Sequence, residues 1–151
     1  MHRRTRRSLF GVAVVAIATT FLTSCLERSP QGLFAISVKS GELIVVNCGD
    51  DIPAPFDVFI SEIDYPDSWT VLDGESATAW GAKETRSATP DGWSEVDESR
   101  AAELAPGHQI NVFYQNSNDS ARASFVVPSE GLQVGSWLQP DGAVLDSPCG
   151  T

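Results

Sequence analysis

The chain has 151 residues, of which 42% are hydrophobic and 20% charged, a length and composition that fit one globular domain. Its formal net charge is -10, although four of its ten basic residues lie within the first seven positions. The rest of the chain contains six Lys and Arg residues and all 20 acidic residues, which gives it a net charge of -14. A body this acidic excludes binding to nucleic-acid phosphates and adsorption to anionic lipids through a basic surface.

The segment 1–24 has the layout of a secretory signal peptide. The basic start is followed by an apolar run from Leu9 to Leu22 and by small residues that lead to Cys25. This run is shorter than the about 20 apolar residues that a permanent transmembrane helix needs. We therefore expect the segment to be cleaved.

Leu22-Thr23-Ser24-Cys25 resembles the lipobox of bacterial lipoprotein precursors. The resemblance implies cleavage just before Cys25, attachment of diacylglycerol and acyl chains such as palmitate to this residue, and a protein anchored at the extracytoplasmic face of the cell membrane. An ordinary signal peptide with a chance cysteine is the alternative. Thr5-Arg6-Arg7-Ser8-Leu9-Phe10 also resembles a twin-arginine export motif with Leu9 and Phe10 interchanged, so the export route stays open between that pathway and the general secretory one.

Lipid on Cys25 leaves Cys48 and Cys149 as an even pair in a compartment that permits oxidation. We predict a disulfide between them, with free thiols or a metal pair as the alternatives. Residues 25–32 are polar, contain Pro30 and Gly32, and are expected to be a lipidated tether with a reach of about 25 Å over its last seven residues. Residues 33–151 then form the domain.

The domain consists of short apolar stretches separated by Pro, Gly, Asp and Ser, which is typical of β-strands. A hairpin with Ser40-Gly41 as its turn is predicted first, and a strand with a buried face begins at Phe56. The predicted strands are Leu33–Lys39, Glu42–Cys48, Phe56–Ile60, Gln109–Gln115, Arg122–Val127, Leu132–Leu138 and Ala143–Leu145, with weaker candidates at Trp69–Leu72 and Ala77–Gly81.

A short helix is predicted over Ser94–Leu104, because Ser94 has the position of an N-cap, Asp97 follows three residues later, and Pro106-Gly107 would end the helix. The number and spacing of the strands indicate an antiparallel β-sandwich. Leu104-x-Pro106-Gly107-x-x-Ile110-x-Val112 resembles the turn into the sixth strand of immunoglobulin-like and fibronectin type III domains, which implies an immunoglobulin-like sandwich. Those families commonly have a tyrosine where this chain has Ile110, so the corner hydrogen bond must be absent or supplied by another residue.

The sequence offers little catalytic chemistry and predicts no cofactor and no metal. His108 is the only histidine after the signal peptide, it follows a turn, and no serine has a nucleophile-elbow motif, so we interpret it as a solvated turn residue. One histidine and two bridged cysteines are too few ligands for zinc. No glycine-rich phosphate loop is present.

Acidic residues are concentrated in two stretches, which we interpret as a solvated surface. Two other uses stay open: a carboxylate pair for glycoside hydrolysis, and calcium, although the EF-hand loop pattern is missing. The members are Asp50, Asp51, Asp57, Glu62, Asp64 and Asp67 in the first stretch, and Asp91, Glu95, Asp97 and Glu98 in the second.

The tryptophans are the remaining candidates for a binding site. Trp69 and Trp137 lie inside predicted strands and are expected in the core, whereas Trp80 and Trp93 flank a polar stretch and are the predicted exposed, ligand-binding pair for a protein or glycan partner. The sequence thus favours a lipid-anchored, non-catalytic binding or accessory module. A cell-surface hydrolase that uses two carboxylates, or a structural subunit of a membrane complex, are the alternatives.

Overall fold

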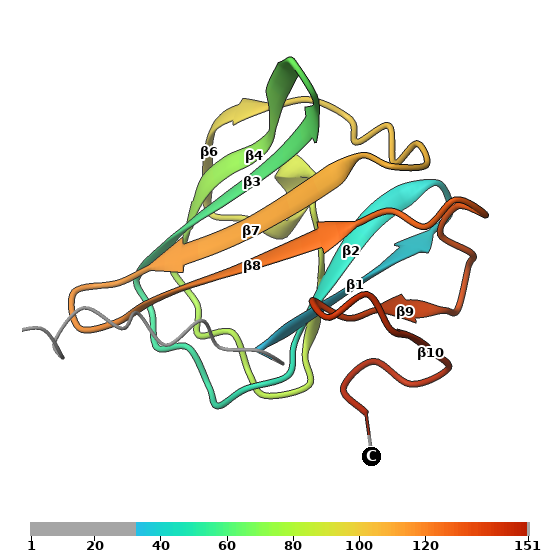
Figure 1. The fold of residues 1–151 in the computed structure, drawn as a ribbon. Helices are drawn as coiled ribbons and strands as arrows, with labels where there is room; N and C mark the ends of the chain where they lie inside the picture. Colours follow the sequence, from blue (N-terminus) through green and yellow to red (C-terminus); the bar gives the residue numbers. More distant parts are fainter. Residues whose placement is uncertain (1–32, 151) are drawn as a thin grey trace, which may run out of the picture.

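The computed structural model describes residues 33–150, so the predicted signal peptide and tether lie outside the described residues. Within this range, ten strands form two antiparallel sheets that pack face to face (Figure 1). The strands are β1 Phe34–Lys39, β2 Glu42–Asn47, β3 Phe56–Asp64, β4 Asp67–Ser76, β5 Thr85–Ser87, β6 Glu95–Ser99, β7 Gln109–Gln115, β8 Ser120–Val126, β9 Trp137–Leu138 and β10 Val144–Leu145. A 3-10 helix at Pro90–Gly92 precedes β6, and no helix of residues 33–150 is long and apolar enough to cross a membrane.

The strand order is β10-β9-β1-β2-β5 in one sheet and β6-β4-β3-β7-β8 in the other. This confirms the predicted antiparallel β-sandwich. The neighbours β3, β7 and β8 have the order of the C, F and G strands of an immunoglobulin-like sandwich, and β1, β2 and β5 have the order of its A, B and E strands.

The core lies between the two sheets and is built by alternation along the strands. In β3, the side chains of Phe56, Val58 and Ile60 are buried, while Asp57 and Phe59 between them are exposed on the outer face. The strand β8 alternates in the same way over its seven residues. This sheet therefore has one apolar inner face and one outer face in contact with water, whereas β1 of the other sheet is buried on both faces from Phe34 to Ser37.

The first hairpin is confirmed, and its turn has the conformation that the sequence requires. Ser40 and Gly41 both have positive φ, 55° and 84°, which is the backbone of a type I′ turn. The predicted limits of Gln109–Gln115 are those of β7, and β8 begins at Ser120, two residues before its predicted start.

The predicted helix over Ser94–Leu104 is wrong, because this segment contains β6 at the edge of a sheet. β6 pairs with β4, and Ser94 uses its hydroxyl to accept a hydrogen bond from the backbone N–H of Ala77 at 2.8 Å instead of capping a helix. Val96 points inward and packs against the core. Pairing with β4 therefore determines the conformation of this segment, although its local sequence resembles a helix N-cap.

Three other strand predictions need correction. Ala77–Gly81 is a loop that joins the sandwich through one bridge between Trp80 and Ile52, and β5 lies in the polar stretch after it, where no strand was expected. The two strands predicted near the C-terminus shrink to the two-residue strands β9 and β10. Short strands with few pairing partners leave little periodicity for a sequence pattern to detect.

Candidate functional site

The predicted disulfide between Cys48 and Cys149 is confirmed and joins residues 101 positions apart. It ties the segment after β10 to the end of β2, next to Asn47, which is fully buried. Cys25 lies outside the described residues.

The expectation of an exposed Trp80–Trp93 pair is wrong. Trp80 is fully buried, and Trp93 is half-buried and packs against the core. The two rings do lie together, with centroids 5.7 Å apart in a T-shaped contact, and Phe56 contacts both. Both indole N–H groups donate to backbone carbonyls, of Glu84 and Ser87 respectively, so neither is free to bind a ligand.

Arg86 fills the space that these aromatic rings enclose. Its guanidinium carbon lies 5.4 to 5.7 Å from the ring centroids of Phe56, Trp80 and Trp93. The guanidinium donates to the Ser76 hydroxyl and to backbone oxygens of the loop before β5, and it forms an ion pair with Glu84 at 3.0 Å. This box of aromatic rings is thus already occupied by a cation of the chain itself.

The other two tryptophans are less buried than expected. Trp69 and Trp137, which were expected in the core, are both half-buried. The guanidinium of Arg100 lies over the Trp69 ring, 4.6 Å from its centroid, and the Trp69 and His108 rings form a T-shaped contact with centroids 5.8 Å apart. Trp69 packs against the core near the start of β4, whereas Trp137 alternates with the core residue Leu138 in β9 and therefore lies on the opposite face of its sheet.

His108 is not the solvated turn residue that was expected, because it is buried and bonded to a buried carboxylate. Its Nδ1 lies 2.7 Å from Glu62 Oε1, and its Nε2 lies 3.5 Å from Asp64 Oδ2. Glu62 is fully buried, contrary to its placement in a solvated acidic stretch, and also accepts the backbone N–H groups of Glu103 and Leu104 at 2.7 Å each. Glu62 therefore makes hydrogen bonds to the backbone of this corner, where Ile110 takes the place of a tyrosine and has no polar group to do so.

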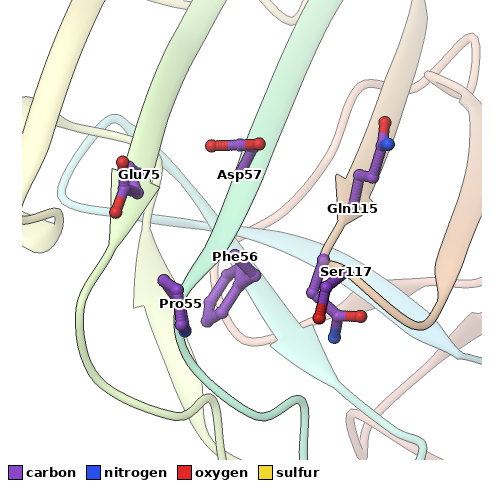
Figure 2. Close-up of a pocket in the computed structure, with 7 residues that line it drawn as sticks. Pro55, Phe56, Asp57, Glu75, Gln115 and Ser117 are labelled. Carbon is purple, nitrogen blue, oxygen red and sulfur yellow. The ribbon is translucent and has the colours of Figure 1, made fainter.

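A pocket of about 360 Å³ lies on the outer face of the β6-β4-β3-β7-β8 sheet, at the ends of β3, β4 and β7. Figure 2 shows Glu75, Asp57 and Gln115 side by side on these three strands, with Phe56 and Ser117 at the end of the pocket. The full lining comprises Pro55, Phe56, Asp57, Glu75, Gln115, Asn116 and Ser117. Two carboxylates and two amides thus border a concave surface.

The register of the strands sets the positions of these side chains. Asp57 is the direct partner of Glu75 on β4 and of Gln115 on β7, and Glu75 is in turn the partner of Glu95 on β6. Directly opposite residues on one face have Cβ atoms about 4.5 to 5.5 Å apart, and like charges in such positions are destabilising. None of the three carboxylates takes part in an ion pair within residues 33–150.

The loop on one side of the pocket is held by its own hydrogen bonds. The side-chain oxygen of Asn116 accepts the backbone N–H groups of Asn118 and Asp119, and the Tyr114 hydroxyl donates to Asp119 at 2.8 Å. Burial, that hydrogen bond and the charge of Asp119 together raise the pKa of Tyr114 to about 12. These contacts fix the backbone from which Ser117 reaches the pocket.

An aromatic pair continues the same outer face beyond the carboxylates. Phe59 and Phe113 are direct partners on β3 and β7, and Phe59 is 37% exposed. The large hydrophobic side chains that are exposed among the described residues otherwise lie on separate segments: Tyr65 in the β3–β4 turn, Val126 on β8, Val134 in a loop and Val144 on β10.

The sequence contained only part of the signal for this pocket. Asp57 belonged to the first acidic stretch, but Glu75 lies 18 residues away and belonged to neither. Alternation of polar with apolar residues around Asp57 was the signal that this residue points outward, whereas the residues around Glu75 are polar or glycine and give no such signal. Only the register places the two carboxylates opposite each other. Residues 33–150 contain no group of three or more His, Cys, Asp or Glu side chains arranged to hold a metal ion.

Comparison with protein-family models, with curated proteins and with solved structures finds no match to this chain.

Proposed function

We propose that the chain is a membrane-anchored, extracytoplasmic binding module that takes a cationic ligand in the pocket bordered by Asp57 and Glu75. The observation that supports this proposal most strongly is the row Glu95–Glu75–Asp57 across three neighbouring strands, which no cation within residues 33–150 neutralises. A bound cation would relieve the repulsion between these carboxylates. The guanidinium of Arg86 does not do so, because its donors are used in the loop before β5.

The proposed anchor is the lipid on Cys25. Phe34, the first residue of β1, is nine residues from Cys25, a stretch that spans at most about 32 Å when fully extended. The Phe34 ring contacts Trp80 and Tyr114; Trp80 stacks on Phe56 of the pocket lining, and Tyr114 directly precedes Gln115 of the same lining. The pocket therefore lies at the end of the sandwich where the chain arrives from its anchor.

Isothermal titration calorimetry with a hexa-arginine peptide as the ligand tests the pocket. The double variant Asp57→Asn/Glu75→Gln should weaken binding about tenfold, because two exposed charge pairs contribute about 1.4 kcal/mol together. Glu130→Gln/Asp141→Asn removes the same charge from exposed loops remote in the fold and should leave binding unchanged. Equal weakening by both double variants, or no binding by the unaltered protein, would rule out the pocket as the site.

Metabolic labelling with a palmitate analogue tests the anchor separately. Label and membrane association should both be lost in Cys25→Ala, and the intact mass should correspond to cleavage before Cys25 in the unaltered protein. Label that persists in the variant, or its absence from both proteins, would overturn the anchor while leaving the pocket proposal standing.

A surface hydrolase is the second candidate function. Asp57 and Glu75 lie opposite each other in the pocket and would serve as its two catalytic carboxylates. Retaining glycosidases hold their carboxyl groups about 5 to 5.5 Å apart. Incubation with polysaccharides of bacterial surfaces discriminates the two functions: release of reducing ends by the unaltered protein, abolished in Asp57→Asn, would favour the hydrolase.

A further inference from the structure

Each of the two sheets has two edges, and only one of these four edge strands is both long and regular. The edge strands β5 and β10 have three and two residues, and β6 has a register shift against β4 and carries Glu95, Asp97 and Glu98. In contrast, β8 has seven residues in unbroken register with β7 and, within residues 33–150, no other partner strand. Proteins commonly protect edge strands with shortness, bulges, prolines or charges, and β8 has only Arg122.

The hydrogen-bonding pattern identifies which backbone groups of β8 face the open edge. The backbone N–H of Val127 donates to the carbonyl of His108 at 2.8 Å. Because such pairs alternate along an antiparallel ladder, the odd-numbered residues of β8 bond to β7 and the even-numbered residues face away from it. The N–H of Ser120 is bonded to Asp119, which leaves the N–H and C=O groups of Arg122, Ser124 and Val126 along the edge.

We propose that two copies of this chain pair along β8, in antiparallel orientation, about a two-fold axis at Ala123. This register places Arg122 of one protomer opposite the partner's Ser124, so that these two residues form complete hydrogen-bonded pairs, and the Val126 N–H donates to the carbonyl of the partner's Ser120. A shift that centred the axis on Arg122 would place two guanidinium groups directly opposite each other, which is unfavourable. The result is one continuous sheet across both copies.

The charge distribution favours this edge over the others for self-association. Arg122 is the only charged residue of β8, and the neighbouring β7 has none. The carboxylate of Asp57 on β3 lies two strand spacings, about 10 Å, from β8, and the carboxylates of β4 lie three spacings, about 14 Å, from it. The first distance equals and the second exceeds the Debye length of about 10 Å at 0.1 M salt. A pair formed along β6 would instead bring Glu95, Asp97 and Glu98 of both copies together.

Cysteine crosslinking in cells that produce the full chain tests the pairing and its register. Two differently tagged copies, Arg122→Cys and Ser124→Cys, are expressed together, and the dimer is measured on non-reducing gels. The mixture should give at least about tenfold more dimer than either variant alone, because only unlike positions come within the about 4.4 to 6.8 Å between Cα atoms that a disulfide spans. Absence of dimer from the mixture, or equal dimer in all three samples, would overturn the proposal.

A second variant separates edge pairing from chance collision. Val126→Pro removes an edge-facing N–H and costs no hydrogen bond to β7, so the fold should be retained and the crosslink lost when this change is added to both copies. Val126→Ala is the matched control and should crosslink like the parent mixture. An undiminished crosslink in a folded Val126→Pro protein would show that the edge is not the interface.

Discussion

Glu62 shows how one buried residue organises a corner of the sandwich. Its two carboxylate oxygens accept from the backbone N–H groups of Glu103 and Leu104 and from His108, at 2.7 Å each. Leu104 has a positive φ of 51°, a conformation that costs energy for a residue with a side chain and persists where neighbouring contacts impose it. The carboxylate thus holds the chain in the turn that leads into β7.

Replacement of Glu62 should therefore be costly. We expect Glu62→Leu to lower the free energy of unfolding by about 3 to 5 kcal/mol, because it leaves two backbone donors and a histidine without their buried partner. Urea denaturation measures this loss. Glu103→Gln, which removes only an exposed ion pair with Arg100, should cost less than about 1 kcal/mol. A Glu62→Leu protein as stable as the control variant would contradict this role for the carboxylate.

The Tyr114 hydroxyl gives a prediction for alkaline pH. Its pKa is raised from 10.0 to about 12, so the folded protein holds this proton more tightly than the unfolded chain does. The associated stability is complete below pH 10 and is lost as the pH rises from about 10 to 12. Absorbance at tyrosinate wavelengths should show one group ionising near pH 12 that disappears in Tyr114→Phe, and Asp119→Asn should move it toward 10. Persistence of this late ionisation in Tyr114→Phe would assign it to another group.

At the scale of elements, β6 owes its position to a glycine on its neighbour. A Cβ atom on Gly74 would lie 2.7 Å from the carbonyl oxygen of Glu95, closer than two such atoms can approach. Only glycine at this position of β4 lets β6 form its register-shifted ladder there. The strand that was predicted as a helix is thus held by a feature of another segment.

Gly74→Ala should separate β6 from the sheet and cost about 1 to 3 kcal/mol of stability. Hydrogen exchange should accelerate at amides of β6 and leave the β3–β7 ladder protected. Gly41→Ala is the control, because its Cβ meets no atom within 4 Å and its cost arises only from a φ of 84° in the first hairpin. Unchanged exchange in β6 would show that the strand tolerates the added methyl group.

For the whole molecule, the bond between Cys48 and Cys149 is the covalent constraint that spans the domain. It joins residues 101 positions apart, and closing a loop of about 100 residues is expected to contribute about 4.7 kcal/mol of stability in the chain-entropy model. The strands that it retains, β9 and β10, have two residues each and add few hydrogen bonds of their own. The C-terminal segment therefore depends on the disulfide more than on the sheet.

Removal of this bond should lower stability by about 2 to 5 kcal/mol. Thermal unfolding of Cys48→Ala/Cys149→Ala, compared with the unaltered protein before and after reduction, measures the effect. The reduced protein and the double variant should melt at similar temperatures, and reductant should not change the melting of the variant. A double variant with the same melting temperature as the oxidised, unaltered protein would show that the disulfide does not stabilise the domain.

The sequence alone determined the sandwich class, the first hairpin, β7 and the disulfide, because alternation, turn residues and cysteine number are local or countable properties. It did not determine the positions of Trp80, Glu62 or β6. Burial of Trp80 beneath Arg86, the partnership of Glu62 with His108 and the edge position of β6 are each fixed by residues distant in the chain. The same holds for the pocket, since Asp57 and Glu75 become neighbours only through strand register. Periodicity shows which face a side chain occupies, and only the tertiary structure decides what lies opposite it.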